Sequence, residues 1–189
     1  MCHALLQDPK FFRLLLRVDR ELAAQTRAGG CPCGGVLHRA NYPRKPRRCL
    51  DEARADYASR FSFCCHRCRK RATSVSVRFF GRRVYLGLAV VLMSARRTEA
   101  TSAVAQLGRL LNVPVRTIQR WRRWWVDEFP RTPLWAATGA RFMPPIALSA
   151  LPASLIERFV GAAGESLLRL LLFLAPWTVR HPVAVNEER

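Results

Sequence analysis

The positions of apolar residues along the chain predict helices towards both ends and two short strands between them. Residues Asp8 to Arg27 place apolar side chains at helical spacing, with Asp8 positioned to cap the helix and Pro9 suited to its first turn. Polar and apolar residues alternate over Arg60–Cys64 and Ala72–Phe80, on either side of a cysteine-bearing turn, which predicts two strands.

Beyond Gly81 the apolar spacing is helical again. We expect helices over Arg82–Ala95, Thr101–Leu111, Val115–Asp127, Ser149–Ala163 and Gly164–Leu174, and a loop with a short helical turn over Arg131–Pro145. The longest apolar runs fall short of the ~20 residues that a membrane-spanning helix needs, so we expect no membrane insertion.

The stretch from Val104 to Trp125 has the pattern of a DNA-reading helix-turn-helix. Apolar residues stand where two crossed helices must pack, Gly108 is small at the crossing, Asn112 suits the turn, and Pro114 begins the second helix. The face left over on that helix predicts a base-reading surface made of Val115, Arg116, Gln119 and Arg120. A helical hairpin in a bundle would show similar spacing, but no acidic residue lies between Arg109 and Trp125, which favours DNA binding.

Two cysteine turns predict a structural metal site. Zinc prefers four soft ligands in a tetrahedron, and here Cys31 with Cys33 and Cys65 with Cys68 supply two thiolates each. Basic residues around the second turn are expected to lower the pKa of these thiols. The alternatives are that Cys64, His66 or His38 replaces one of these ligands, while Cys2 and Cys49 are interpreted as spare thiols. Reduced cysteines without a metal are the less favoured interpretation.

The net charge is strongly positive and points to a polyanionic partner. Lysine and arginine number 32 against 13 acidic residues, a formal charge of +19, and such an excess repels itself unless a polyanion is near. Nucleic acid is the favoured partner and an acidic membrane surface the competing one. The residues expected to contact DNA phosphates are Arg44, Lys45, Arg47, Arg48, Arg69, Lys70, Arg71, Arg82, Arg83, Arg96, Arg97, Arg122 and Arg123.

A cysteine-rich module of the form CPCGG…FCCHRCRKR followed by QLGRLLNVPVRTIQRWRRWW resembles the N-terminal DNA-binding region of bacterial insertion-sequence transposases and their accessory proteins. The resemblance covers roughly residues 31–125. It implies zinc ligands at Cys31, Cys33, Cys65 and Cys68, base-reading residues at Arg116, Gln119 and Arg120, and a role in a mobile genetic element, either in transposition or in its regulation.

The resemblance does not extend to catalysis. The acidic residues after Trp125 lie in a helical pattern without the strands of a ribonuclease-H-like fold, and no tyrosine or serine has a recombinase-like setting. We therefore expect a double-stranded DNA-binding protein that is not an enzyme, acting as a homodimer or with a separate transposase subunit. The alternatives are an RNA-binding module that stacks bases on Tyr42 and Phe80, and, less favoured, a zinc nuclease using His66 or His38.

The predicted fold class is mainly α, with a small β module like a zinc ribbon, a three-helix helix-turn-helix unit and C-terminal helices. The expected divisions are an N-terminal helix (1–30), the zinc module with a basic loop (31–81), the DNA-binding domain (82–130) and a C-terminal region for packing, dimerisation or partner docking (131–189). The N-terminus lacks the early positive charge and cleavage site of a secretory signal, so a cytoplasmic, nucleoid-associated bacterial protein is expected.

Overall fold

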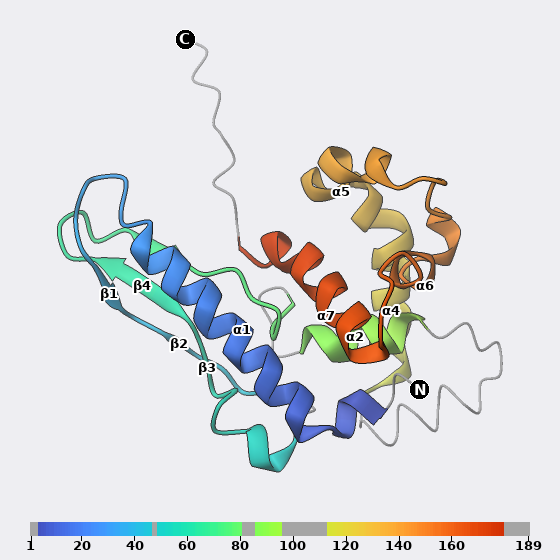
Figure 1. Ribbon diagram of the computed structural model, residues 1–189, viewed down its shortest axis with the longest axis horizontal. Coiled ribbons are helices and arrows are strands. Elements are labelled where there is room, and N and C mark those ends of the chain that lie inside the picture. Colours follow the sequence, from blue (N-terminus) through green and yellow to red (C-terminus); the bar gives the residue numbers. More distant parts are fainter. Residues whose placement is uncertain (1–3, 47–48, 81–85, 96–112, 180–189) are drawn as a thin grey trace, which may run out of the picture.

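The computed structural model describes residues 4–46, 49–80, 86–95 and 113–179, and these form a helix-rich chain with a small antiparallel sheet (Figure 1). One long helix, α1 (Pro9–Ala28), lies across the sheet at the left of the view, and the other α-helices lie at the right. None of the helices in this part of the chain combines the length and apolar character that crossing a bilayer requires.

Helix α1 begins and ends where the sequence predicts. The Asp8 carboxylate accepts the backbone N–H of Lys10 at 2.8 Å, and Pro9 occupies the first turn, where no donor is needed. At the other end the Gly29 N–H donates to the Gln25 carbonyl, and Gly30 turns the chain at a φ of +67°. A short 3-10 helix, η1 (Ala4–Gln7), precedes α1.

The sheet has three strands in the order β1 (Leu37–Arg39), β4 (Ser62–Cys65) and β5 (Arg71–Thr73), all antiparallel to their neighbours. Leu37 lies opposite Cys65, and Cys64 lies opposite Arg71. A two-stranded extension pairs β2 (Tyr42–Pro43) with β3 (Ser59–Arg60), and the 3-10 helix η2 (Asp51–Ala53) lies between them in the chain. The predicted strand over 60–64 is thus confirmed, as β3 and β4 on either side of Phe61.

The predicted strand over Ala72–Phe80 is wrong beyond Thr73. The alternation predicts one buried and one polar face, but Ser74, Ser76 and Arg78 are as deeply buried as Val77 and Phe79. Ser76 and Arg78 donate to the Asp19 carboxylate of α1, and the Ser76 N–H also donates to Thr178 of the C-terminal 3-10 helix η7 (Ala175–Thr178). The Ser74 carbonyl accepts from Arg60 of β3, and the Ser74 hydroxyl donates to the Val75 carbonyl. The segment is therefore packed on both sides and leaves the sheet.

The helical part is built around α2 (Gly87–Ala95), α4 (Val115–Arg123) and α7 (Ala163–Leu174). Helix α4 continues through one π-helical turn, η3 (Trp124–Glu128), and one 3-10 turn, η4 (Phe129–Arg131). The expected helix over 101–111, with Gly108 and Asn112, lies outside the described residues.

Two of the C-terminal expectations need correction. The predicted helix over 149–163 is instead η6 (Leu148–Ala150) and a single α-helical turn, α6 (Ala153–Ile156), because Pro152 interrupts the first half and Gly161 has a φ of +135°. The predicted loop over 131–145 contains more helix than expected, in α5 (Pro133–Thr138) and η5 (Gly139–Arg141). Thr132 caps α5 by accepting the Trp135 N–H.

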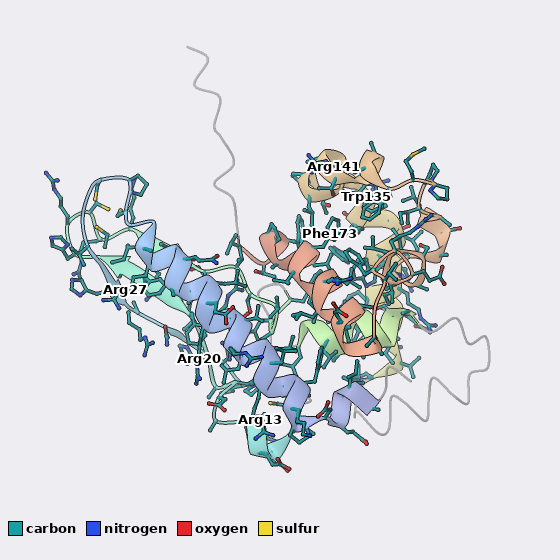
Figure 2. All side chains as sticks on the ribbon, viewed as in Figure 1. Arg13, Arg20, Arg27, Trp135, Arg141 and Phe173 are labelled. Atoms are coloured by element: carbon teal, nitrogen blue, oxygen red, sulfur yellow. The ribbon has the colours of Figure 1, made fainter. Side chains whose placement is uncertain are left out.

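The core joins α1 to the helical part. Phe12 and Leu15 of α1, Phe79, and Leu170 of α7 belong to one buried cluster. Trp125 is fully buried in it. Aromatic rings continue outwards through Phe129, Trp135, Phe142 and Phe173, and Figure 2 shows Trp135 and Phe173 between α5 and α7.

At the centre lies a buried ion pair between Asp19 of α1 and Arg78. Arg78 Nε donates to the Asp19 carboxylate at 2.7 Å, and both side chains are excluded from solvent. The same carboxylate accepts the Ser76 hydroxyl and the Val77 N–H, while the guanidinium donates to the carbonyls of Asp56 and Ser59. The pair therefore has hydrogen-bond partners on both sides, as a buried pair requires.

Replacing Asp19 with alanine should destabilise the protein strongly. Arg78 would remain buried without its counter-charge, so we expect the free energy of unfolding to fall by about 3–5 kcal/mol. Urea titration followed by tryptophan fluorescence measures this change. Asp56→Ala is the control, because its exposed carboxylate lies 3.9 Å from Arg20, and such a pair contributes less than about 1 kcal/mol. Equal losses in the two variants would contradict the central role of Asp19.

Candidate metal centre

Four cysteine side chains meet beyond the C-terminal end of α1. Cys31 and Cys33 stand in the turn between α1 and β1, Cys65 ends β4, and Cys68 lies in the turn to β5. Their Sγ atoms all lie within 4.8 Å of one another. These are the four residues that the spacing selects, so their convergence into one group that can hold a metal ion is confirmed.

The distances between the sulfur atoms suit a tetrahedral ion. Cys31 and Cys33 Sγ are 3.4 Å apart, Cys31 and Cys68 Sγ 3.5 Å, and Cys33 and Cys65 Sγ 3.5 Å. Metal–sulfur bonds of about 2.3 Å in a tetrahedron place the sulfurs about 3.8 Å apart. These three separations are a few tenths of an ångström below that value, and all the sulfur atoms lie within 4.8 Å of one another, so the cluster is close to a tetrahedral ligand set.

The two glycines after Cys33 make the first turn possible. Gly34 has a φ of +75°, which disfavours other residues, and its N–H donates to the Cys31 carbonyl at 2.8 Å. A Cβ at Gly35 would lie 2.5 Å from Cys65 Sγ and 3.3 Å from Cys33 Sγ. Only a residue without a side chain lets the chain pass this close to the sulfurs.

Hydrogen bonds from backbone N–H groups act to lower the pKa of the cysteine thiols. The N–H groups of Cys68 and Arg67 donate to Cys65 Sγ and lower the pKa of that thiol to about 6. At Cys31 the Cys33 N–H acts in the same direction, but contacts with neighbouring thiols and burial outweigh it and raise the pKa to about 12. Metal binding must therefore displace protons from the group, since metal ions bind thiolates. The backbone, rather than the basic side chains around the second turn, is the leading cause of the lowered pKa at Cys65.

The alternative ligands lie outside the four-sulfur group. Cys64 Sγ donates to the Arg69 carbonyl at 3.4 Å, and His66 Nδ1 accepts the Val36 N–H at 3.0 Å. The His38 ring packs edge-on against His66, with centroids 6.0 Å apart. Cys49 is buried in the core, where burial raises the pKa of its thiol to about 11. Cys2 lies outside the described residues.

The residues expected to read bases form the exposed face of α4. Val115, Arg116, Gln119 and Arg120 are all exposed. Ile118 and Trp121 point the other way and pack with Val90 of α2 and with Val113. The amphipathic pattern of this helix therefore separates a solvent-facing side from a core side where the sequence places them.

The residues expected to contact phosphates do not form one continuous surface among the described residues. Lys45, Arg69, Lys70, Arg71 and Arg123 are exposed, and Arg44 and Arg122 are half-buried. Arg69, Lys70 and Arg71 lie at the β4–β5 end of the molecule, away from α4 (Figure 1), whereas the Arg44 guanidinium lies 5.6 Å from the ring centroid of Phe79 in the core. The remaining six, Arg47, Arg48, Arg82, Arg83, Arg96 and Arg97, lie outside the described residues.

Tyr42 and Phe80, the two aromatic residues considered for base stacking, differ in exposure and in what their rings contact. The Phe80 ring is half-buried and packs against Trp124 and Trp125, with centroids 5.4 and 5.9 Å away. Tyr42 is exposed, but the Arg71 guanidinium lies 4.1 Å from its ring centroid. Trp124 also contacts Trp177 beyond α7.

The arginines of α1 form a surface that the sequence patterns above do not single out. Arg13, Arg20 and Arg27 recur every seven residues and therefore lie on one side of the helix (Figure 2). The seven-residue repeat is visible in the sequence, but exposed arginines are common on helices and the repeat alone indicates no site. The structure adds that Arg39 of β1 lines the same groove as Arg20 and Arg27.

No protein-family model, curated protein or solved structure matches this chain, so its function has to be inferred from the site itself.

Metal binding should depend on the four clustered thiols and not on their neighbour. Elemental analysis of the purified protein should give about one metal ion per chain, as a tetrahedral four-thiolate site implies. We expect Cys65→Ser and Cys68→Ser to lose that ion and to unfold at lower temperature, because bound metal stabilises the folded state. Cys64→Ser changes the adjacent thiol and should retain the ion. A metal-free native protein, or loss of metal in Cys64→Ser alone, would refute this assignment.

Proposed function

We propose that the chain binds double-stranded DNA sequence-specifically, with α4 as the recognition helix of a helix-turn-helix and with a structural zinc ion in the cysteine cluster. The observation that carries this proposal is the division of α4 into two faces. Arg116, Gln119 and Arg120 are exposed together, while Ile118 and Trp121 anchor the helix on the protein.

The exposed face has the chemistry that base reading needs. Residues three and four apart are neighbours on a helix, so these three side chains can reach adjacent base pairs in a major groove, which is wide enough to admit an α-helix. Arginine pairs bidentately with guanine, glutamine with adenine, and Val115 can contact a thymine methyl group. Helix α4 carries no acidic residue that would repel the phosphates.

Zinc is the metal that fits the cluster best. Four thiolates in a tetrahedral arrangement are typical of structural zinc sites, whereas catalytic zinc keeps one position open for water. The four sulfurs leave no such position, and His66 is engaged by the Val36 backbone. We therefore infer that the zinc-ribbon-like module supports the fold and the binding surface, and that the chain itself does not cut DNA.

The biological setting follows from the resemblance to insertion-sequence proteins. A bacterial, nucleoid-associated protein that recognises the end or operator of a mobile element would need this combination of zinc module and recognition helix. Catalysis would then come from a separate transposase subunit. A homodimer would place two recognition helices about 34 Å apart, one helical turn of DNA.

Arg116→Ala and Arg120→Ala should each weaken binding to the preferred sequence more than binding to other duplexes. Selection of duplexes from a random library by the unmodified protein identifies the preferred sequence. Loss of one bidentate pairing costs about 1–3 kcal/mol, so we expect about 5- to 150-fold weaker binding to that sequence. Competition against a scrambled duplex measures the change in preference.

Arg123→Ala and Arg141→Ala are the matched controls. Arg123 is an expected phosphate contact, so its replacement should weaken binding to all duplexes alike and lower the salt dependence by about 0.9 in the slope. Arg141 is exposed on η5, away from α4, and its replacement should change little (Figure 2). Unchanged sequence preference in both Arg116→Ala and Arg120→Ala would refute the recognition-helix assignment.

A further inference from the structure

A groove lies between the C-terminal half of α1 and the sheet. It has a volume of about 440 Å³ and is lined by Arg20 and Arg27 with three alanines of α1, by Arg39 of β1, and by Phe61 and Phe63. Neither the metal centre nor the exposed face of α4 uses it. The C-terminal half of α1 and β1, which line the groove, lie towards the opposite end of the long axis from α4 (Figure 1).

The rim of the groove is positively charged from both sides. Arg20 and Arg27 are seven residues apart, about 10 Å along the helix axis, and Arg39 approaches from the sheet. Arg20 lies 3.9 Å from the Asp56 carboxylate, both of them exposed. Within the described part of the chain, neither Arg27 nor Arg39 forms an ion pair with a carboxylate. The rim thus offers two guanidinium groups for an anion.

The floor of the groove is apolar and partly aromatic. Phe63 is buried, and Phe61 is partly exposed, with the Arg78 guanidinium 4.8 Å from its ring centroid on the core side. Alanines on α1 keep the helix side of the groove shallow and apolar. A ligand that fits both parts must carry an anionic group next to a flat, weakly polar one.

We propose that this groove holds one unpaired nucleotide of a nucleic-acid strand, with its phosphate between Arg27 and Arg39 and its base against Phe61. Arginine forks match phosphate geometry, and bases of unpaired strands stack on aromatic side chains with about 1–3 kcal/mol each. The volume is within the range of single-ligand sites. A duplex keeps its base faces stacked internally, so it has only charged backbone to set against the apolar floor.

This site goes beyond the proposed duplex recognition and does not depend on it. The recognition helix and the groove are carried by different elements, and their residues do not overlap. A protein with both surfaces can hold a duplex and an unpaired strand at the same time, which suits DNA next to a frayed or open region.

The test is binding of a fluorescein-labelled oligothymidylate to the full zinc-loaded chain, followed by fluorescence anisotropy over a range of salt. Arg27→Ala with Arg39→Ala should weaken this binding at least tenfold and lower the salt slope by about 0.7 for each phosphate that is no longer neutralised. Phe61→Leu keeps the floor apolar but removes the ring, and should weaken binding without changing the salt slope. Metal content and thermal unfolding confirm that each variant is folded.

Arg131→Ala with Arg141→Ala is the matched control, because it removes the same charge from exposed positions outside the groove. Equal binding of oligothymidylate by the unmodified protein and by the folded Arg27→Ala, Arg39→Ala variant would overturn the proposal. So would complete displacement by polyglutamate at equal charge concentration, which would identify an acidic peptide site. Arg116→Ala should leave oligothymidylate binding unchanged, so failure of duplex recognition and failure of the groove are distinguished.

Discussion

The Asp19–Arg78 ion pair is the interaction on which the packing of α1 against the rest of the described chain depends. It connects α1, the segment after β5 and the carbonyls of Asp56 and Ser59, which are distant in sequence. Arg60 makes a second link, donating to the Ser74 and Thr178 carbonyls. These buried polar contacts hold the sheet at a defined position relative to the helices. A purely apolar contact has no such directional preference, because the hydrophobic effect is non-directional.

The cysteine cluster lies where the chain leaves the C-terminal end of α1. The turn after Gly30 brings Cys31 and Cys33 to the sulfurs of β4 and of the following turn. A bound ion would therefore tie the chain just beyond α1 to the sheet. The same tie would restrict the separation of α1 from β1, the two elements that carry the arginines of the groove.

The aromatic core has a comparable role for α4. Trp125 is fully buried and contacts Phe80 and Phe129, while Trp121 packs with Ile118 and Val113 in the smaller cluster. With these rings turned inwards, the helical period leaves Arg116 and Arg120 outwards. Orientation of the proposed recognition face is thus a consequence of where the large apolar side chains pack.

The sequence alone determined the features with a strict local pattern. Capping by Asp8, the glycines after α1, the pairs of cysteines and the amphipathic spacing of α4 each depend on residues close together in the chain. Tertiary structure decided the rest. Ser76 and Arg78 have the spacing of a polar strand face, yet they are buried because Asp19, far away in sequence, accepts hydrogen bonds from both side chains and Thr178 accepts the Ser76 N–H. The groove likewise needs Arg27 and Arg39 on opposite walls, a pairing that no local period encodes.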